Sequence, residues 1–80
     1  MDREKALRRF GANVRRLRKL KGLSQEELAA MARCHRNYLG GVERGERNIT
    51  LTKVLDLANA IGCPVHHLFQ GLQSQSTDKR

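Results

Sequence analysis

The fold is decided by residues 24–44, whose sequence is SQEELAAMARCHRNYLGGVER. Ser24, followed three residues later by Glu27, is typical of a capping box, in which the two residues satisfy each other's free amides at the start of a helix. Small and apolar side chains then recur at helical spacing until a break before Arg36, where a second helix begins that runs to about Arg44. The stretch therefore predicts two short helices joined by a tight turn.

The second of these helices is predicted to have one apolar face and one polar or bare face. Leu39 and Val42 fall on the inward side. The positions expected to face outward are Arg36, Asn37, Gly40 and Gly41. A helix supported from one side in this way can lie in a groove of DNA.

The residues on either side predict three further helices. The first spans about Arg3 to Lys21 and ends at Gly22. A fourth begins at the N-cap Thr50 and ends at Gly62. The inward faces expected for these two helices are Leu7, Phe10, Val14 and Leu17, and then Leu51, Val54, Leu55, Ala58 and Ile61.

A short fifth helix is predicted from Pro64 to Gln70, stopped by Gly71. The sequence thus predicts an all-α, five-helix domain over residues 1–71 and a polar, disordered tail over residues 72–80. A chain of 80 residues is long enough for one small domain, whose modest core favours dimerisation.

Positive charge is concentrated in the first helix. The net charge of the chain is +8, of which +7 falls on residues 1–21. Two interpretations stand: a solvated helix face, or a surface that attracts a polyanion, with nucleic acid favoured over a membrane. No long apolar run or signal segment is present, so we expect a soluble, cytoplasmic protein.

Residues 22–29 and 35–48 together resemble the Cro and phage-repressor helix-turn-helix family, and in style the short controller proteins of restriction-modification systems. The resemblance covers about residues 5–71 and implies a compact, lambda-repressor-like DNA-binding domain. Arg33 departs from the family pattern, which has glycine in the turn, and His35 departs from the usual Ser, Thr or Asp cap. We therefore expect a left-handed backbone at Arg33, at a cost of about 1 kcal/mol.

The resemblance also assigns residues to DNA. Arg36 and Asn37 are expected to meet base edges, together with positions 40 and 41, where both residues are glycine; arginine pairs well with guanine and asparagine with adenine. The candidate phosphate-binding residues are Gln25, Tyr38, Arg47, Asn48, Thr50, Thr52 and Lys53. Packing in the core is an equally favoured alternative for Tyr38, and the minor groove is a second possible target for Arg47. The alternative for residues 47–53 as a whole is a capped loop that is exposed to solvent and makes no DNA contact.

Two structural assignments follow. Relatives carry a buried ion pair between the first helix and the recognition helix, and the matching residues are Arg18 and Glu43. The apolar side chains Val65, Leu68 and Phe69 exceed what one small core needs, which predicts a dimer interface in the C-terminal part.

Catalysis and cofactors are not indicated. The chain has no phosphate-binding glycine loop or metal-ligand helix motif, and Cys34 and Cys63 are expected to be small core residues that bind no metal and form no disulfide.

The sequence therefore predicts a sequence-specific transcriptional regulator, a repressor or activator that binds a pseudo-palindromic operator as a homodimer. Its expected partners are double-stranded DNA on the nucleoid, a second copy of the chain and RNA polymerase, with no membrane, small-molecule ligand or cofactor. The alternative function is an antitoxin-type interaction module that regulates its own promoter.

Overall fold

A computed structural model describes residues 1–73 and contains the five predicted helices. These are α1 (Arg3–Leu20), α2 (Gln25–Met31), α3 (Arg36–Glu43), α4 (Leu51–Ile61) and α5 (Val65–Leu68). No strand occurs in this part of the chain. The predicted all-α fold is therefore confirmed.

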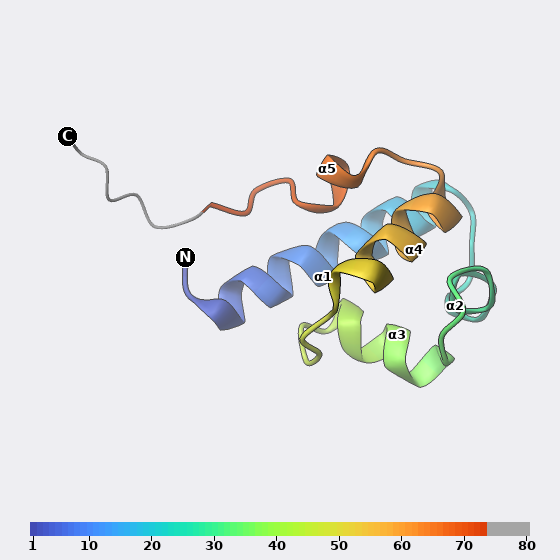
Figure 1. The fold of residues 1–80 in the computed structure, drawn as a ribbon, viewed down its shortest axis with the longest axis horizontal. Helices are drawn as coiled ribbons and strands as arrows, with labels where there is room; N and C mark the ends of the chain where they lie inside the picture. Colours follow the sequence, from blue (N-terminus) through green and yellow to red (C-terminus); the bar gives the residue numbers. More distant parts are fainter. Residues whose placement is uncertain (74–80) are drawn as a thin grey trace.

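The long helix α1 runs through the domain, and the shorter helices pack around it (Figure 1). α3 and α5 contact α1 directly, while α2 packs between α3 and α4. The core between them is made of Phe10, Val14, Leu28, Ala29, Ala32, Leu39, Val42, Val54, Leu57, Ala58, Ile61 and Leu68. One core thus holds all five helices.

The end of α1 has the hydrogen-bond pattern that its sequence predicts. Gly22 adopts a left-handed backbone with φ of 79°. Its amide donates to the Lys19 carbonyl, and the Leu23 amide donates to the Arg18 carbonyl, so that two unpaired carbonyls of the last turn are satisfied. Gly62 ends α4 with a similar backbone, and Thr50 caps the start of that helix as predicted.

The inward face of α4 differs from the prediction. Leu57 is fully buried, whereas Leu51 and Leu55, which were expected in the core, are 70% and 42% exposed. Because leucine or valine occupies four positions within two turns, apolar spacing alone does not fix which of them turns toward α1.

Two residues of α1 make close tertiary contacts that the sequence pattern did not reveal. Asn13 is buried, and its amide donates to the carbonyls of Leu68 and Gln70 at 2.9 and 2.8 Å. At Gly11, a Cβ atom would lie 2.2 Å from the Val42 carbonyl oxygen, so α1 and α3 can approach this closely because residue 11 lacks a side chain.

The C-terminal segment is shorter as a helix than predicted but remains attached to the core. α5 ends at Leu68, and Leu72 packs against the core with its amide bonded to the Phe69 carbonyl. Leu72 is therefore part of the domain, although it was assigned to the tail. The rest of the predicted disordered tail, from residue 74 onward, lies outside the described residues. Among residues 1–73, no helix combines the length and apolarity needed to span a membrane.

Candidate nucleic-acid interface

α2 and α3 form a helix-turn-helix unit whose local geometry follows from its capping residues. The Ser24 hydroxyl accepts from the Glu27 amide at 3.0 Å, and the Glu27 carboxylate accepts from the Ser24 amide at 2.8 Å, which completes the predicted capping box. In the turn, Arg33 has the expected left-handed backbone, with φ of 61°. This non-glycine residue is strained, which is the cost of the tight turn.

α3 begins with an unusual cap. The His35 ring nitrogen Nδ1 accepts from the Asn37 amide at 2.9 Å. A neutral imidazole can accept in this way if its other nitrogen carries the proton. His35 therefore serves as the N-cap, the role of Ser, Thr or Asp in the family pattern. Arg36 and Asn37, the first two residues of the helix, are both exposed.

A buried ion pair fixes α3 against α1. Arg18 Nε and Nη2 donate to the two carboxylate oxygens of Glu43 at 2.7 and 3.1 Å. The side chains are only 9% and 4% exposed. Arg18 Nη1 also donates to the Leu23 carbonyl, and Gln25 Nε2 donates to Glu43 at 3.0 Å. The structure thus brings together the pair expected from the resemblance and joins the first residue of α2 to it.

Gln25 and Arg36 share an open hollow at the entrance of the helix-turn-helix unit. It has a volume of about 390 Å³, and its lining also includes Arg18, Ser24 and Glu26. One side-chain N–H of Gln25 donates to Glu43, so a phosphate could accept only from the second side-chain N–H or from the main-chain N–H of Gln25.

Gly40 and Gly41 require a correction. Both were expected to face outward toward bases, but both are buried. A Cβ atom at Gly40 would lie 3.1 Å from Arg44 Nη1, and one at Gly41 would lie 3.0 Å from Arg47 Cγ. Two arginine side chains that follow the helix cover the two glycines, so neither glycine offers a bare surface.

Tyr38 lies partly in the core rather than fully in solvent. It packs against the buried residues, and the Arg47 guanidinium carbon lies 5.4 Å from the centre of its ring. This cation–π contact orients Arg47 across the outer side of α3. The packing interpretation of Tyr38 thus has a contact in the structure, and its phosphate contact stays a prediction.

The loop before α4 presents Arg47, Asn48 and the N-cap Thr50, and the first turn of α4 presents Thr52; all four residues are exposed. The Thr50 hydroxyl accepts from the Lys53 amide at 3.2 Å, as an N-cap does, and lies 3.4 Å from the Thr52 hydroxyl. The start of a helix of this length carries partial positive charge suited to a phosphate.

The Lys53 side chain is engaged within the protein. Its ammonium donates to the carbonyls of Ala32 and Arg33 at 2.9 and 3.1 Å and pairs with Asp56 at 3.2 Å. These partners satisfy free carbonyls at the end of α2. A phosphate contact by Lys53 would require this ammonium to leave these partners, so it stays a prediction and is not among the contacts proposed below.

The predicted dimer residues divide into two kinds. Leu68 is completely buried in the core, and Val65 is half-buried against it, so the prediction that Leu68 lies at an interface is wrong. Phe69 is 40% exposed, with its ring 5.5 Å from that of Phe10.

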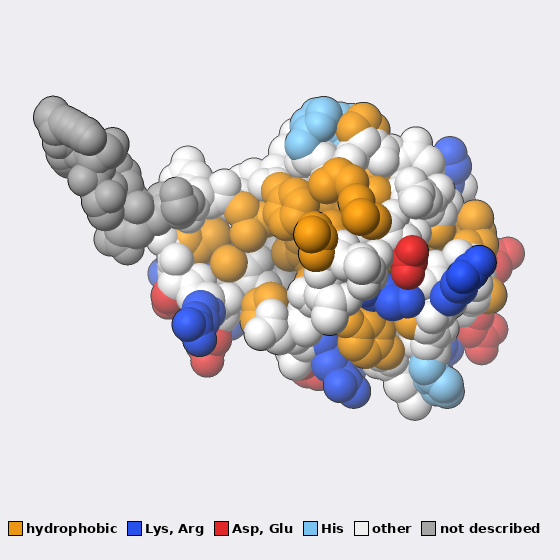
Figure 2. All heavy atoms as spheres, viewed as in Figure 1, with side chains coloured by type: hydrophobic (Ala, Val, Ile, Leu, Met, Phe, Trp, Pro, Cys, Tyr) orange, Lys and Arg blue, Asp and Glu red, His pale blue; other side chains and the backbone are white. Residues whose placement is uncertain are grey.

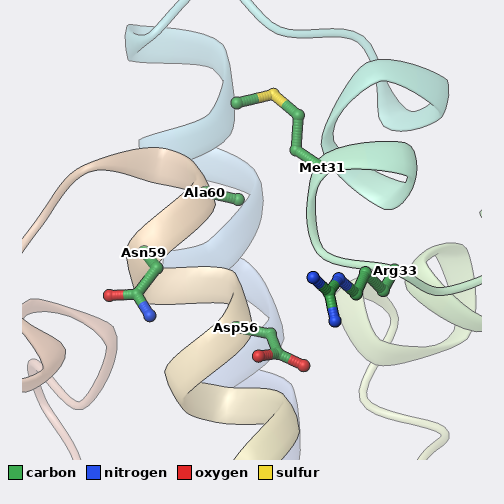
Figure 3. A pocket seen from close by; sticks show the side chains of 5 residues that line it. All are labelled: Met31, Arg33, Asp56, Asn59 and Ala60. Atoms are coloured by element: carbon green, nitrogen blue, oxygen red, sulfur yellow. The ribbon is translucent and has the colours of Figure 1, made fainter.

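A separate groove lies between α2 and α4, away from the start of α3. Figure 3 shows Met31 and Arg33 on one side and Asp56, Asn59 and Ala60 on the other, with the Arg33 guanidinium pointing toward Asp56. The groove holds about 360 Å³. It is open, and its lining is mostly polar.

Cys34 and Cys63 are half-buried beside the core and are not joined to each other. Burial raises the pKa of both thiols above the ordinary value of 9.0. Among residues 1–73, no cluster of three or more His, Cys, Asp or Glu side chains is arranged to hold a metal ion.

Comparison with known proteins identifies the family. The sequence model described as helix-turn-helix matches residues 14–68. The chain is 46% identical over 65 residues to the control protein C.SmaI of Serratia marcescens, covering 79% of this chain and 77% of the relative. It is 41% identical over 54 residues to the control protein C.BamHI of Bacillus amyloliquefaciens, covering 66% and 67%. The crystal structure of the restriction-modification controller protein C.AhdI from Aeromonas hydrophila matches with a TM-score of 0.77 and 49% identity, covering 79% of this chain and 96% of that one.

The helix-turn-helix geometry, the family match and the relatives agree. The chain belongs to the helix-turn-helix family and is a DNA-binding transcriptional regulator.

Proposed function

We propose that this regulator is the controller protein of a restriction-modification system and binds a pseudo-palindromic operator as a homodimer. The observation that carries the proposal is the exposed start of α3, where Arg36 and Asn37 stand on a helix that the buried Arg18–Glu43 pair fixes to α1. The likeness to C.SmaI and C.AhdI over most of their lengths supports the controller role.

Arg36 and Asn37 have the chemistry for base recognition. A guanidinium can donate to two acceptors of guanine, and a carboxamide can donate to and accept from adenine. Both side chains are exposed at the N-terminal end of α3, which is the end that a recognition helix directs toward bases. The phosphate contacts that we propose around them come from Gln25, Tyr38, Arg47, Asn48, Thr50 and Thr52.

The dimer interface is proposed on the outer side of α4 and α5. Hydrophobic side chains gather over this region of the surface (Figure 2). Leu51 and Leu55, one turn apart on α4, and Phe69 after α5 are large hydrophobic residues left exposed by one copy of the domain. A symmetric pair would cover them and place two α3 helices in successive major grooves, about 34 Å apart.

Bound to an operator on the nucleoid in the cytoplasm, such a dimer would act on transcription by blocking RNA polymerase or by contacting it. Which of the two occurs depends on where the operator lies relative to the promoter.

Footprinting on DNA upstream of the chain's own gene tests the proposal. We expect a protected pseudo-palindrome with two half-sites about one helical turn apart. Protection should disappear with Arg36→Ala at protein concentrations that saturate the wild type. A protected site that lacks two-fold symmetry would contradict the dimer, and no protected site in that region would contradict control of its own operon.

The interface has its own test in sedimentation. Leu55→Asp should yield a monomer that keeps its helical content, because this side chain is 42% exposed and does not hold the core. Leu20→Asp is the matched control, since Leu20 is 75% exposed on α1. A Leu55→Asp protein that sediments as a dimer would place the interface elsewhere.

A further inference from the structure

The backbone conformation of α3 does not require the two adjacent glycines in the middle of the helix. Gly40 and Gly41 have no positive φ, since the glycines with left-handed backbone among residues 1–73 are at positions 22, 45, 62 and 71. Each glycine inside a helix costs about 1 kcal/mol relative to alanine. What the two glycines provide is space, and that space is filled by side chains from outside the helix.

Arg44 fills the space above Gly40. It is the first residue after α3, and its guanidinium reaches back one turn, so that Nη1 would lie 3.1 Å from a Cβ atom on residue 40. The same point lies 3.9 Å from both side-chain polar atoms of Gln25. The guanidinium therefore stands where a side chain of residue 40 would be, next to the start of α2.

The orientation of this guanidinium leaves its outer edge available. Nε pairs with Glu46 at 3.1 Å, and the arginine side chain is 61% exposed. Among residues 1–73, Nη1 and Nη2 of Arg44 donate to no other residue, whereas all three side-chain nitrogens of Arg18 donate. Two parallel N–H groups on a planar fork suit a phosphate group.

We propose that Arg44 binds a backbone phosphate of DNA beside Gln25, with its guanidinium in the place left free by Gly40; this rests on the DNA-binding face proposed above. Glu46 holds Nε and turns the fork outward. The sequence places Arg44 at the end of the recognition helix without a DNA contact, and the family resemblance assigns a contact to Gly40 instead.

Binding titrations of Arg44→Ala on operator and scrambled duplexes at several salt concentrations test this. We expect an affinity loss of about tenfold per subunit on both duplexes, as for one charge-assisted hydrogen-bonded contact. The slope of log K against log salt should become shallower by about one unit per subunit. Arg9→Ala is the matched control: it removes the same charge from α1, where Arg9 lies against Gly71 on the C-terminal side, and should change affinity less than twofold.

Gly40→Ala separates the DNA contact from helix stability. The added methyl group should stabilise α3 against urea, because alanine is the better helix former. It should also displace Nη1 of Arg44 and weaken binding to both duplexes. The double variant Gly40→Ala/Arg44→Ala should bind DNA as strongly as Arg44→Ala alone, because the contact that Gly40→Ala disturbs is already absent.

The outcomes are distinct. If the wild type binds no duplex, the DNA-binding face itself is wrong. If the wild type binds and Arg44→Ala binds equally well, or loses affinity on the operator alone, the assignment of a phosphate contact to Arg44 is overturned while the face stands.

Discussion

Replacing Glu43 by glutamine removes the charge from the buried pair that fixes the recognition helix. Glutamine keeps the shape of the side chain but places an NH₂ group where one of two carboxylate oxygens accepts from Arg18, at 2.7 and 3.1 Å in the wild type. The guanidinium is then buried beside a donor. Breaking a buried pair costs about 3–5 kcal/mol. For a domain of this size the melting temperature should fall by roughly 12 °C or more, at about 4–8 °C per kcal/mol.

Thermal and urea unfolding followed by circular dichroism at one protein concentration measure this loss, because a dimer's stability depends on concentration. Glu46→Gln is the matched control. It makes the same chemical change in a pair with Arg44 whose side chains are 61% and 60% exposed. An exposed pair contributes less than about 1 kcal/mol, so this variant should melt close to the wild type.

The reasoning is refuted if Glu43→Gln melts as Glu46→Gln does. A second comparison uses Arg18→Met combined with Glu43→Leu, which removes both charges. This double variant should be more stable than Glu43→Gln alone, since it leaves no unpaired buried charge. Strictly additive losses would mean that the two side chains are not coupled.

Three further predictions follow from the geometry of single residues. Gly11→Ala should destabilise the domain by about 1–3 kcal/mol in urea unfolding, because the new methyl group meets backbone 2.2 Å away; a gain in stability, as helix propensity alone would give, would contradict the close crossing of α1 and α3. Arg33→Gly should raise stability by about 1 kcal/mol by relieving the left-handed backbone, and a loss would show that the arginine contributes more than its strain costs. Burial raises the pKa of Cys34 and Cys63, so both thiols should stay protonated and react slowly with iodoacetamide at pH 8; rapid alkylation of the native protein would contradict this. The free energy of unfolding should also fall as the pH rises above 9.0, because the thiols of the unfolded chain ionise before those of the folded protein.

The features that were predictable from sequence are those decided within one turn of chain. Helix ends depend mainly on neighbouring residues, so they can be predicted without knowledge of tertiary contacts. Examples are the capping box at Ser24, the N-cap at Thr50 and the left-handed glycines at positions 22 and 62.

The features that sequence missed depend on partners far along the chain. Asn13 is buried because its amide bonds the carbonyl of Leu68, 55 residues away. Lys53 has the sign and position of a phosphate-binding residue, but the end of α2, some 20 residues earlier, supplies carbonyl partners for its ammonium. No local pattern carries either contact.

The candidate interface shows the same division. Arg36 and Asn37 are exposed where the helix-turn-helix spacing puts them. Gly40 and Gly41 are not, because the side chains that cover them come from residues after the helix, and the direction of those side chains depends on the turn that follows.

Binding titration of Arg36→Ala on the operator and on a scrambled duplex measures most directly whether α3 recognises sequence. Base contacts carry sequence information and phosphate contacts do not. We predict a loss of about 1–3 kcal/mol per half-site on the operator, relaxed preference at one base pair, and almost no change on the scrambled duplex. An equal loss on both duplexes would make Arg36 a phosphate contact and would contradict α3 as the recognition helix.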